Sequence, residues 1–340
     1  MVRYGILGFG LHGWKRLVPA FAGAKNSKLT GIWRRNLDKA KANANDYGIE
    51  TVFATAEELC ASPQVDAVFV TSPDALHMRD SLLAMSHKKA VLCEKPLAMS
   101  VEEVEQMLAA AKKANVRFGV AQNFRYNRSV DLIRKWVEAG RIGKPVFATS
   151  NFYFQSAQSQ RAWIYDPSLA RGGPIGDVGI HCLDVLRYIL RDDVAAVTTL
   201  AHRDAKSGGV EASAALSMDF RNGAIGSILV SFRSQYRSLV EIVGETGVIR
   251  SENGLTVTGM VDVQLLESGK VLDSQQVTNA DAYSRMLDGF SDAFEGRGSY
   301  RAPGQDGLNN QRVLDAAYAS WKSGCKETIS SRRMADSSRA

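Results

Sequence analysis

The chain has 340 residues, of which 45% are hydrophobic, 23% charged and 8% aromatic. This length suits about two domains of roughly 150 residues each, and the composition excludes collagen-like and wholly disordered chains and shows no apolar run long enough for a membrane helix. The net charge is +6, but no predicted helix carries a basic stripe with interleaved aromatic residues, so the charge favours small anionic ligands over nucleic acid.

The first 120 residues alternate short β-rich apolar runs with amphipathic stretches. Strands are predicted at 3–7, 29–33, 51–53, 67–71, 90–93 and 117–121. Helices are predicted at 11–21, 37–47, 75–86 and 101–114, where Ser100 and Glu103 form a capping box for the last of them. Strand and helix repeating at this pitch predict an α/β fold with a doubly wound parallel sheet.

After about residue 145 the runs become longer and alternate in polarity, which indicates a mainly antiparallel sheet. Strands are predicted at 145–154, 210–220, 224–232, 239–243 and 257–266. Two Asn-Gly pairs, at Asn222 and Asn253, predict tight hairpins. Helices are predicted at 184–190, 282–294 and 305–323, and the Ser/Arg-rich residues 331–340 are expected to form a loose tail.

A Gly-x-Gly-x-x-Gly sequence follows the first strand and opens the first helix, and it consists of Gly8, Phe9, Gly10, Leu11, His12 and Gly13. Gly8 permits the tight turn, Gly10 lets the backbone approach a pyrophosphate, and Gly13 allows close helix–strand packing. The free amides at the helix start would hold the phosphate charge. This context predicts a dinucleotide-binding Rossmann domain over residues 1–123, followed by an α/β domain with an open antiparallel sheet over 124–330.

The end of the second strand predicts which dinucleotide is bound. An acidic residue there would accept from a free ribose 2′-hydroxyl, but this chain has Arg34 and Arg35, with Lys39 one helical turn further on. Guanidinium groups form charge-assisted bonds with a phosphate, so the pair favours NADP, with NAD as the alternative.

Two further motifs carry candidate catalytic residues. Glu94-Lys95-Pro96 ends the fifth strand, at the carboxyl edge where doubly wound sheets bind ligands. A glycine-rich turn leads to Asp177 and His181, which are four residues apart and so share a helix face. With the fingerprint, these motifs make the chain resemble the Gfo/Idh/MocA family of oxidoreductases over nearly its whole length.

The resemblance implies roles for these residues. Lys95, Asp177 and His181 would line the substrate site: His181 would act as the base, Asp177 would orient its imidazole, and Lys95 would donate to the substrate oxygen and stabilise alkoxide charge. Which of Lys95 and His181 transfers the proton stays open. Glu94 would lie beside the cofactor, and the chemistry needs no metal ion.

Weaker matches to the family add further candidates. Thr71, Ser72 and Pro73, with His77 after them, resemble the family's loop under the nicotinamide, and Asn123 would touch cofactor or substrate.

Other weaker matches concern the substrate side of the site. Arg125 and Trp163 are further candidates for contact with the substrate. Relatives often have Trp-Arg where this chain has Trp163-Ile164, and Arg161 or Arg171 could replace the missing arginine.

The expected activity is reversible hydride transfer between a nicotinamide and a secondary alcohol or carbonyl of a sugar, inositol or related polyol. A nicotinamide-dependent glycosidase and a non-catalytic dinucleotide-binding regulator are the alternatives. The four cysteines form no CxxC pair and no secretory signal is visible, which predicts a reducing, cytoplasmic setting. The open sheet predicts a homodimer or homotetramer.

Overall fold

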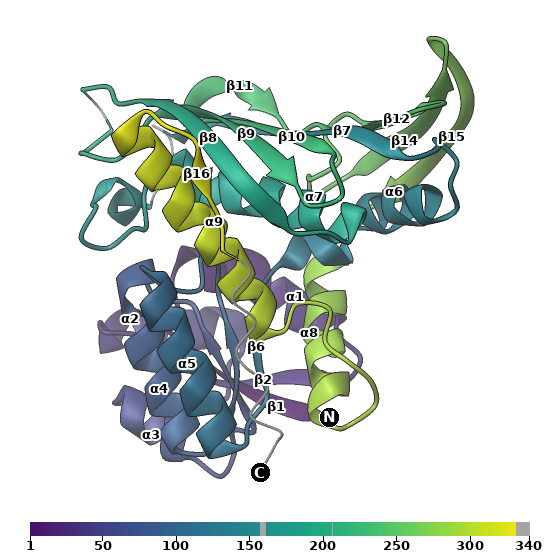
Figure 1. The fold of residues 1–340 in the computed structure, drawn as a ribbon. Helices are drawn as coiled ribbons and strands as arrows, with labels where there is room; N and C mark the ends of the chain where they lie inside the picture. The colour runs from purple at the N-terminus through teal and green to yellow at the C-terminus, as the bar shows by residue number, and fades with distance from the viewer. Residues whose placement is uncertain (157–160, 206, 331–340) are drawn as a thin grey trace, which may run out of the picture.

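The computed structural model describes residues 1–156, 161–205 and 207–330. Its first half is a six-stranded parallel sheet in the order β3-β2-β1-β4-β5-β6 (Figure 1). The strands are β1 (Val2–Leu7), β2 (Ser27–Trp33), β3 (Thr51–Val52), β4 (Ala67–Val70), β5 (Ala90–Cys93) and β6 (Phe118–Val120). Every residue of β4 and β5 is buried, as parallel strands covered on both faces require. The doubly wound fold is confirmed.

Helices cover both faces of this sheet. They are η1 (Gly13–Leu17), α1 (Val18–Gly23), α2 (Leu37–Tyr47), α3 (Ala56–Ala61), η2 (Asp74–Leu76), α4 (His77–Ser86), α5 (Val101–Ala114) and η3 (Asn123–Tyr126). Helices α2 and α5 have the predicted bounds, whereas the six residues of α3 were too few to show a period. The Ser100 hydroxyl accepts from the Glu103 amide at 3.3 Å, but the Glu103 carboxylate accepts from the amide of Met99 rather than Ser100.

The second half is built on a ten-stranded sheet among the described residues. Its strands are β7 (Pro145–Gln155), β8 (Val194–His202), β9 (Ser213–Phe220), β10 (Ile225–Ser231), β11 (Arg233–Arg237), β12 (Val240–Gly244), β13 (Val248–Ser251), β14 (Met260–Glu267), β15 (Lys270–Thr278) and β16 (Glu327–Thr328). The order is β15-β14-β13-β12-β7-β10-β9-β8-β16, with β11 beside β7. All pairs are antiparallel except β10 with β7, which confirms the mainly antiparallel sheet.

One of the two predicted hairpins is tight. Gly223, at φ +90°, turns the chain between β9 and β10. The Asn253 pair instead lies in an eight-residue connection, 252–259, between β13 and β14. The prediction of a tight turn there is wrong because the carbonyls of Gly254 and Thr256 bond to Asn127 and Asn279 and hold the loop open.

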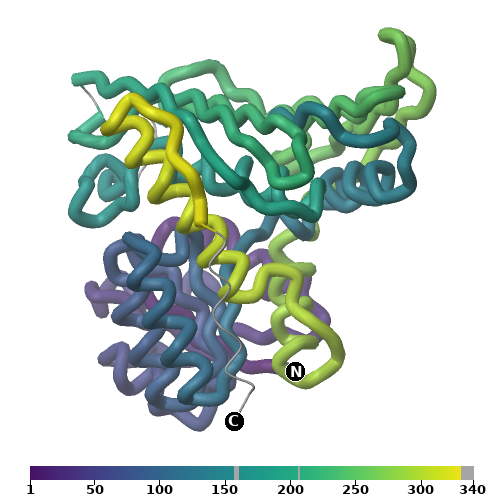
Figure 2. Tube along the Cα trace, viewed as in Figure 1, coloured from purple at the N-terminus to yellow at the C-terminus, as the bar shows by residue number. Residues whose placement is uncertain are grey.

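The remaining helices lie between the sheets or beside the first one. They are α6 (Arg128–Glu138), η5 (Ala162–Tyr165), η6 (Ile175–Gly179), α7 (Ile180–Leu190), α8 (Ala282–Phe294) and α9 (Gly304–Ser323). Helices α6, α7 and α9 lie under one face of the large sheet, and α8 descends beside the first domain (Figures 1 and 2). Met286 and Phe290 of α8 belong to the first hydrophobic core, so the chain returns there after residue 280.

The domain boundary at residue 123 stays a prediction, and the predicted tail, 331–340, lies outside the described residues. Helix α9 contributes Leu308 to the first core and Leu314 to the second, so it joins the two. Within the described residues, no helix has the length and apolar character that crossing a bilayer requires.

Candidate active site

The loop after β1 is shaped by two glycines. Gly8 has φ +84°, and a Cβ on it would lie 2.6 Å from the backbone nitrogen of Ser72. A Cβ on Gly13 would lie 2.7 Å from the ring of Phe9. The amides of Gly8 and Phe9 both donate to the carbonyl of Trp33, at 3.0 and 3.1 Å. The loop is therefore fixed against the ends of both β2 and β4.

These contacts divide the fingerprint into supporting and exposed positions. Phe9 is fully buried and its amide is already bonded, so it supports the loop rather than contacting a ligand, contrary to the prediction. Around Gly10 the nearest atom to an added Cβ is 3.7 Å away, which leaves room for a phosphate to approach. Leu11 and His12 begin the helix, and η1 is a π turn, a feature common at functional sites.

The basic residues after β2 differ in how firmly they are held. Arg34 is half-buried and donates through Nη1 to Oδ1 of Asn43 at 2.8 Å. Arg35 and Lys39 are exposed. Because the neighbouring Trp33 carbonyl is bonded to the fingerprint loop, Arg34 is a pre-positioned cation at the edge of that loop.

Lys95, Asp177 and Arg161 form one ion-pair cluster across the two domains. The Lys95 Nζ lies 3.0 Å from Oδ1 of Asp177 and donates to its backbone carbonyl at 2.8 Å. Arg161 binds both carboxylate oxygens of Asp177, at 3.1 and 2.8 Å. Burial would raise the pKa of Asp177, but Arg161 and Lys95 outweigh burial and hold it well below its ordinary value. Asp177 is therefore a fixed anion.

Glu94, the residue before Lys95, forms an ion pair with His12. His12 Nε2 lies 3.0 Å from Oε1 of Glu94. Burial would raise the pKa of Glu94, but His12, Lys95 and His181 lower it to about 2. The ring of Tyr283, at the start of α8, lies 5.7 Å from that of His12. The fingerprint helix, the Glu94-Lys95 turn and α8 thus meet at one edge.

His181 is buried at the start of α7, with its ring 4.4 Å from that of Phe124. Its Nδ1 has no hydrogen-bond partner among the described residues. Burial and the charge of Lys95 lower the pKa of His181 to about 3, against partial opposition from Asp177 and Glu94. The predicted role of Asp177 as orienter of this imidazole is wrong for this structure, because its carboxylate is bound by Lys95 and Arg161 instead.

Two residues of the loop after β4, and of the helix that follows it, bond to backbone carbonyls and so support the site. Thr71 donates to the carbonyls of Leu7 and Gly8, which ties this loop to the fingerprint. His77 is buried with both ring nitrogens 2.8 Å from backbone carbonyls, so the predicted contact of His77 with cofactor is wrong. Pro73 precedes η2.

Two buried polar atoms at the carboxyl edge of the first sheet have no hydrogen-bond partner among the described residues. They are the buried Ser72 Oγ and Asn123 Nδ2, at the ends of β4 and β6. Buried polar groups are ordinarily hydrogen-bonded, so these two atoms indicate a ligand or water at this edge.

Arg125 is not free to bind substrate. Its guanidinium holds both oxygens of Asp184, at 2.8 and 2.7 Å, and a carboxylate oxygen of Asp306 at 2.6 Å, and it is buried. The predicted substrate contact is wrong because these ion pairs tie η3 to α7 and α9.

Of the two arginines considered as replacements, Arg161 reaches the site. Arg171 instead pairs with Asp315 at 2.8 Å. Trp163 lies half-buried on η5, two residues after Arg161, and its contact with substrate stays a prediction.

Three residues at the site had no signal in the sequence. Tyr283 and Phe124 come from elements that only the fold brings to this edge. Glu211 precedes β9, and its buried carboxylate accepts from the amides of Gly173 and Ile175, at 3.0 and 2.8 Å, so it caps the turn that leads to Asp177. A carboxylate at a helix start is favourable because the free amides there are electropositive.

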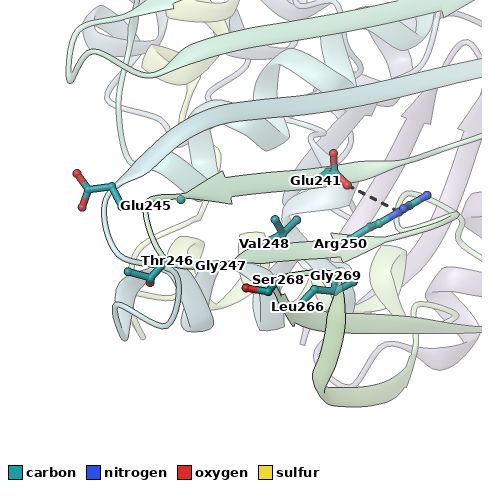
Figure 3. Close-up of a pocket in the computed structure, with 10 residues that line it drawn as sticks. Glu241, Glu245, Thr246, Gly247, Val248, Arg250, Leu266, Ser268 and Gly269 are labelled. Carbon is teal, nitrogen blue, oxygen red and sulfur yellow. Dashed lines mark ion pairs between the residues drawn. The ribbon is translucent and has the colours of Figure 1, made fainter.

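A cavity of about 400 Å³ lies elsewhere, between the hairpin ends of β12, β13 and β14 (Figure 3). Its charged lining includes Glu241 and Arg250, which form an ion pair at 3.8 Å. None of its lining residues is a candidate site residue.

Comparison with known families decides the class of protein. The profile of the oxidoreductase family with an NAD-binding Rossmann fold matches residues 2–122, and that of the GFO/IDH/MocA C-terminal domain matches residues 130–250. The chain belongs to the Gfo/Idh/MocA family of oxidoreductases. The resemblance seen in the three motifs is confirmed, and so is the expectation of an enzyme.

Relatives in this family match nearly the whole chain. The 1,5-anhydro-D-fructose reductase of Ensifer adhaerens is 29% identical over 312 residues, 91% of this chain and 92% of that protein. A D-xylose 1-dehydrogenase (NADP(+)) of Haloferax volcanii is 28% identical over 325 residues, 94% of this chain and 98% of that protein. The structure of an aldose-aldose oxidoreductase from Caulobacter crescentus complexed with glycerol has a TM-score of 0.88 at 25% identity, and the match covers 96% and 99% of the two chains.

Proposed function

We propose that this enzyme transfers hydride reversibly between NADP(H) and a secondary alcohol or carbonyl of a sugar, inositol or related polyol. The observation that carries the proposal is the Lys95–Asp177–Arg161 cluster beside His181, at the carboxyl edge of the NAD-binding sheet. Relatives named for reactions on sugars support the substrate class.

The residues at this edge fit a dinucleotide. The space around Gly10 admits a phosphate, and the buried Ser72 Oγ and Asn123 Nδ2 have hydrogen-bonding capacity that the described residues leave unused. Gly10, Leu11 and His12 would hold the pyrophosphate and Arg34 the ribose phosphate. When bound, the nicotinamide supplies the acceptor or donor of the hydride.

The candidate catalytic side chains stabilise charge on the substrate oxygen and transfer the hydroxyl proton. Lys95 is held at Nζ by Asp177 and directs its charge to the substrate oxygen, where it stabilises developing negative charge. His181 is neutral at physiological pH because burial and the charge of Lys95 lower its pKa to about 3, and its Nδ1 has no hydrogen-bond partner among the described residues. A base with so low a pKa is weak, so His181 takes the hydroxyl proton only if bound substrate and cofactor raise that pKa, and Lys95 is the alternative. Asp177 acts on Lys95 and Arg161, which its carboxylate holds in place, rather than on His181.

NADP preference rests on the cations after β2. Arg34 is anchored by Asn43 and stands where a carboxylate would otherwise accept from a ribose hydroxyl. One relative is itself named an NADP(+) enzyme. We therefore expect tighter binding of NADP than of NAD.

A homodimer or homotetramer through the open sheet face is part of the proposal. The face opposite α7 exposes large apolar side chains, among them Leu200 at 64% and Phe147 and Ile225 at 48% each. Phe147 and Ile225 are register partners on β7 and β10, so they form one continuous patch. Contiguous apolar surface of this kind marks interaction sites, and a second copy offers a matching surface.

The deciding experiment measures reduced nicotinamide by its near-ultraviolet absorbance with a panel of aldoses, polyols and glycosides. We expect net oxidation or reduction of NADP(H) with at least one free sugar or polyol, and loss of that turnover in His181→Ala. Glycoside cleavage without net change in the cofactor would instead identify a glycosidase. Cofactor binding with neither reaction would identify a regulator and overturn the proposal.

A further inference from the structure

His77, at the start of α4, makes two hydrogen bonds to different loops. Its Nδ1 lies 2.8 Å from the carbonyl oxygen of Pro96, and its Nε2 lies 2.8 Å from the carbonyl oxygen of Ser72. The side chain is 1% exposed. One imidazole therefore spans the gap between the loop after β4 and the turn that carries Lys95.

The chemistry of the two partners restricts the ring's protonation state. A carbonyl oxygen only accepts, so each ring nitrogen has to donate. A neutral imidazole has one donor and one acceptor, and it would point a lone pair at one of the carbonyls. Only the imidazolium, with two N–H groups, satisfies both contacts.

The surroundings of His77 are suited to a buried cation. The side chains of Cys93 and of the buried Asp74 both act electrostatically on His77. Burial would lower the pKa of His77, but Cys93, Asp74 and the Pro96 carbonyl raise it to about 10. Asp74 also accepts from the amide of Arg171 at 2.9 Å, so the pair reaches the second domain.

We propose that His77 is a permanently charged imidazolium that positions Lys95 by bridging the Ser72 and Pro96 carbonyls. The Ser72 side of the bridge is itself fixed, because Thr71 donates to the carbonyls of Leu7 and Gly8. The Pro96 side adjoins Lys95 directly. His77 thus sets the distance between the fingerprint loop and the catalytic ammonium without contacting cofactor or substrate.

The charge is tested by nuclear magnetic resonance of the protein labelled with ¹⁵N-histidine. The chain has five histidines, and the exposed His202 serves as the internal reference. We expect both ring nitrogens of His77 to keep the chemical shift of protonated nitrogens from pH 6 to pH 8. A His77 ring that loses a proton within this pH range, or is neutral at pH 8, would overturn the proposal.

The positioning role is tested with His77→Gln, which can donate to one carbonyl but cannot bridge two. A displaced catalytic group costs up to about 10²-fold in rate, so kcat should fall by that order while the dissociation constant of the cofactor is unchanged. His202→Gln is the matched control and should keep both values. Full kcat in His77→Gln would refute positioning.

The kinetic measurement and the nuclear magnetic resonance spectrum test the proposal independently of each other. The kcat measurement rests on the proposed function, whereas the spectrum needs no substrate and tests the bridge by itself. If His77→Gln does not fold, variants of the other four histidines identify the His77 signals by elimination, and the spectrum still decides the charge.

Discussion

The proposed preference for NADP is tested by replacing Arg34, the anchored cation after β2, by Ala. Arg34 is half-buried and held by Asn43 at 2.8 Å, so little side-chain entropy is lost when it binds a phosphate. A charge-assisted hydrogen bond is worth about 1.5–3 kcal/mol, which predicts that NADP⁺ binds about 10- to 10²-fold more weakly. NAD⁺ has no phosphate at this position, and its affinity should not change.

Two further variants close to Arg34 serve as comparisons for the loss of NADP⁺ binding. Arg35 is exposed, and an exposed ion pair contributes only about 0–1 kcal/mol, so Arg35→Ala should weaken NADP⁺ binding by less than about tenfold. Lys41→Ala, at an exposed position of α2, is the control and should change neither affinity.

The assay is a tryptophan-fluorescence or calorimetric titration with both cofactors at one fixed ionic strength, because salt screens these charges. A role of Arg34 in selecting NADP⁺ is refuted if Arg34→Ala weakens the binding of NAD⁺ and NADP⁺ equally, or if the unmodified enzyme binds the two with the same affinity. Either result would mean that Arg34 serves the fold of the β2–α2 connection and not the ribose phosphate.

Three further outcomes follow from the site and the sheet. His181→Ala should lower kcat by about 10²- to 10⁴-fold with the cofactor affinity intact, as measured by steady-state kinetics and titration; near-normal turnover would move the proton transfer to Lys95. The pKa of His181 is lowered to about 3. Its ordinary value is about 6.5, so between those values the unfolded chain binds more protons and the free energy of unfolding should fall as pH drops. Urea denaturation at pH 7 and pH 5 measures this, and His181→Phe should show a weaker dependence. Leu229→Asp, on the exposed sheet face, should shift sedimentation toward the 37.1 kDa single chain; a chain that is already monomeric without the substitution would contradict the proposed dimer.

Local sequence was sufficient for the elements whose pattern lies within a few residues. The fully apolar runs of β4 and β5 and the periodic faces of α2 and α5 could be located to within a residue or two, since burial on both faces or on one stripe leaves a regular pattern. The edge strand β15 could not, because 270–278 is mostly exposed and polar and pairs only with β14. Its strand conformation depends on a partner and not on its own periodicity.

The same division holds at the site. The sequence by itself identified the candidate catalytic residues, because the fingerprint, the Glu94-Lys95 turn and the Asp177–His181 spacing are motifs that each lie within a few residues of the chain. Only the tertiary structure decided how they are connected, since a long-range ion pair depends on where distant elements pack. In the folded chain Asp177 pairs with Lys95 and Arg161 rather than with His181. Arg125 is buried in ion pairs with Asp184 and Asp306. His77 lies between two backbone carbonyls. The chemical type of a side chain limits which groups it can bind, and the fold determines which of those groups lies close enough to be bound.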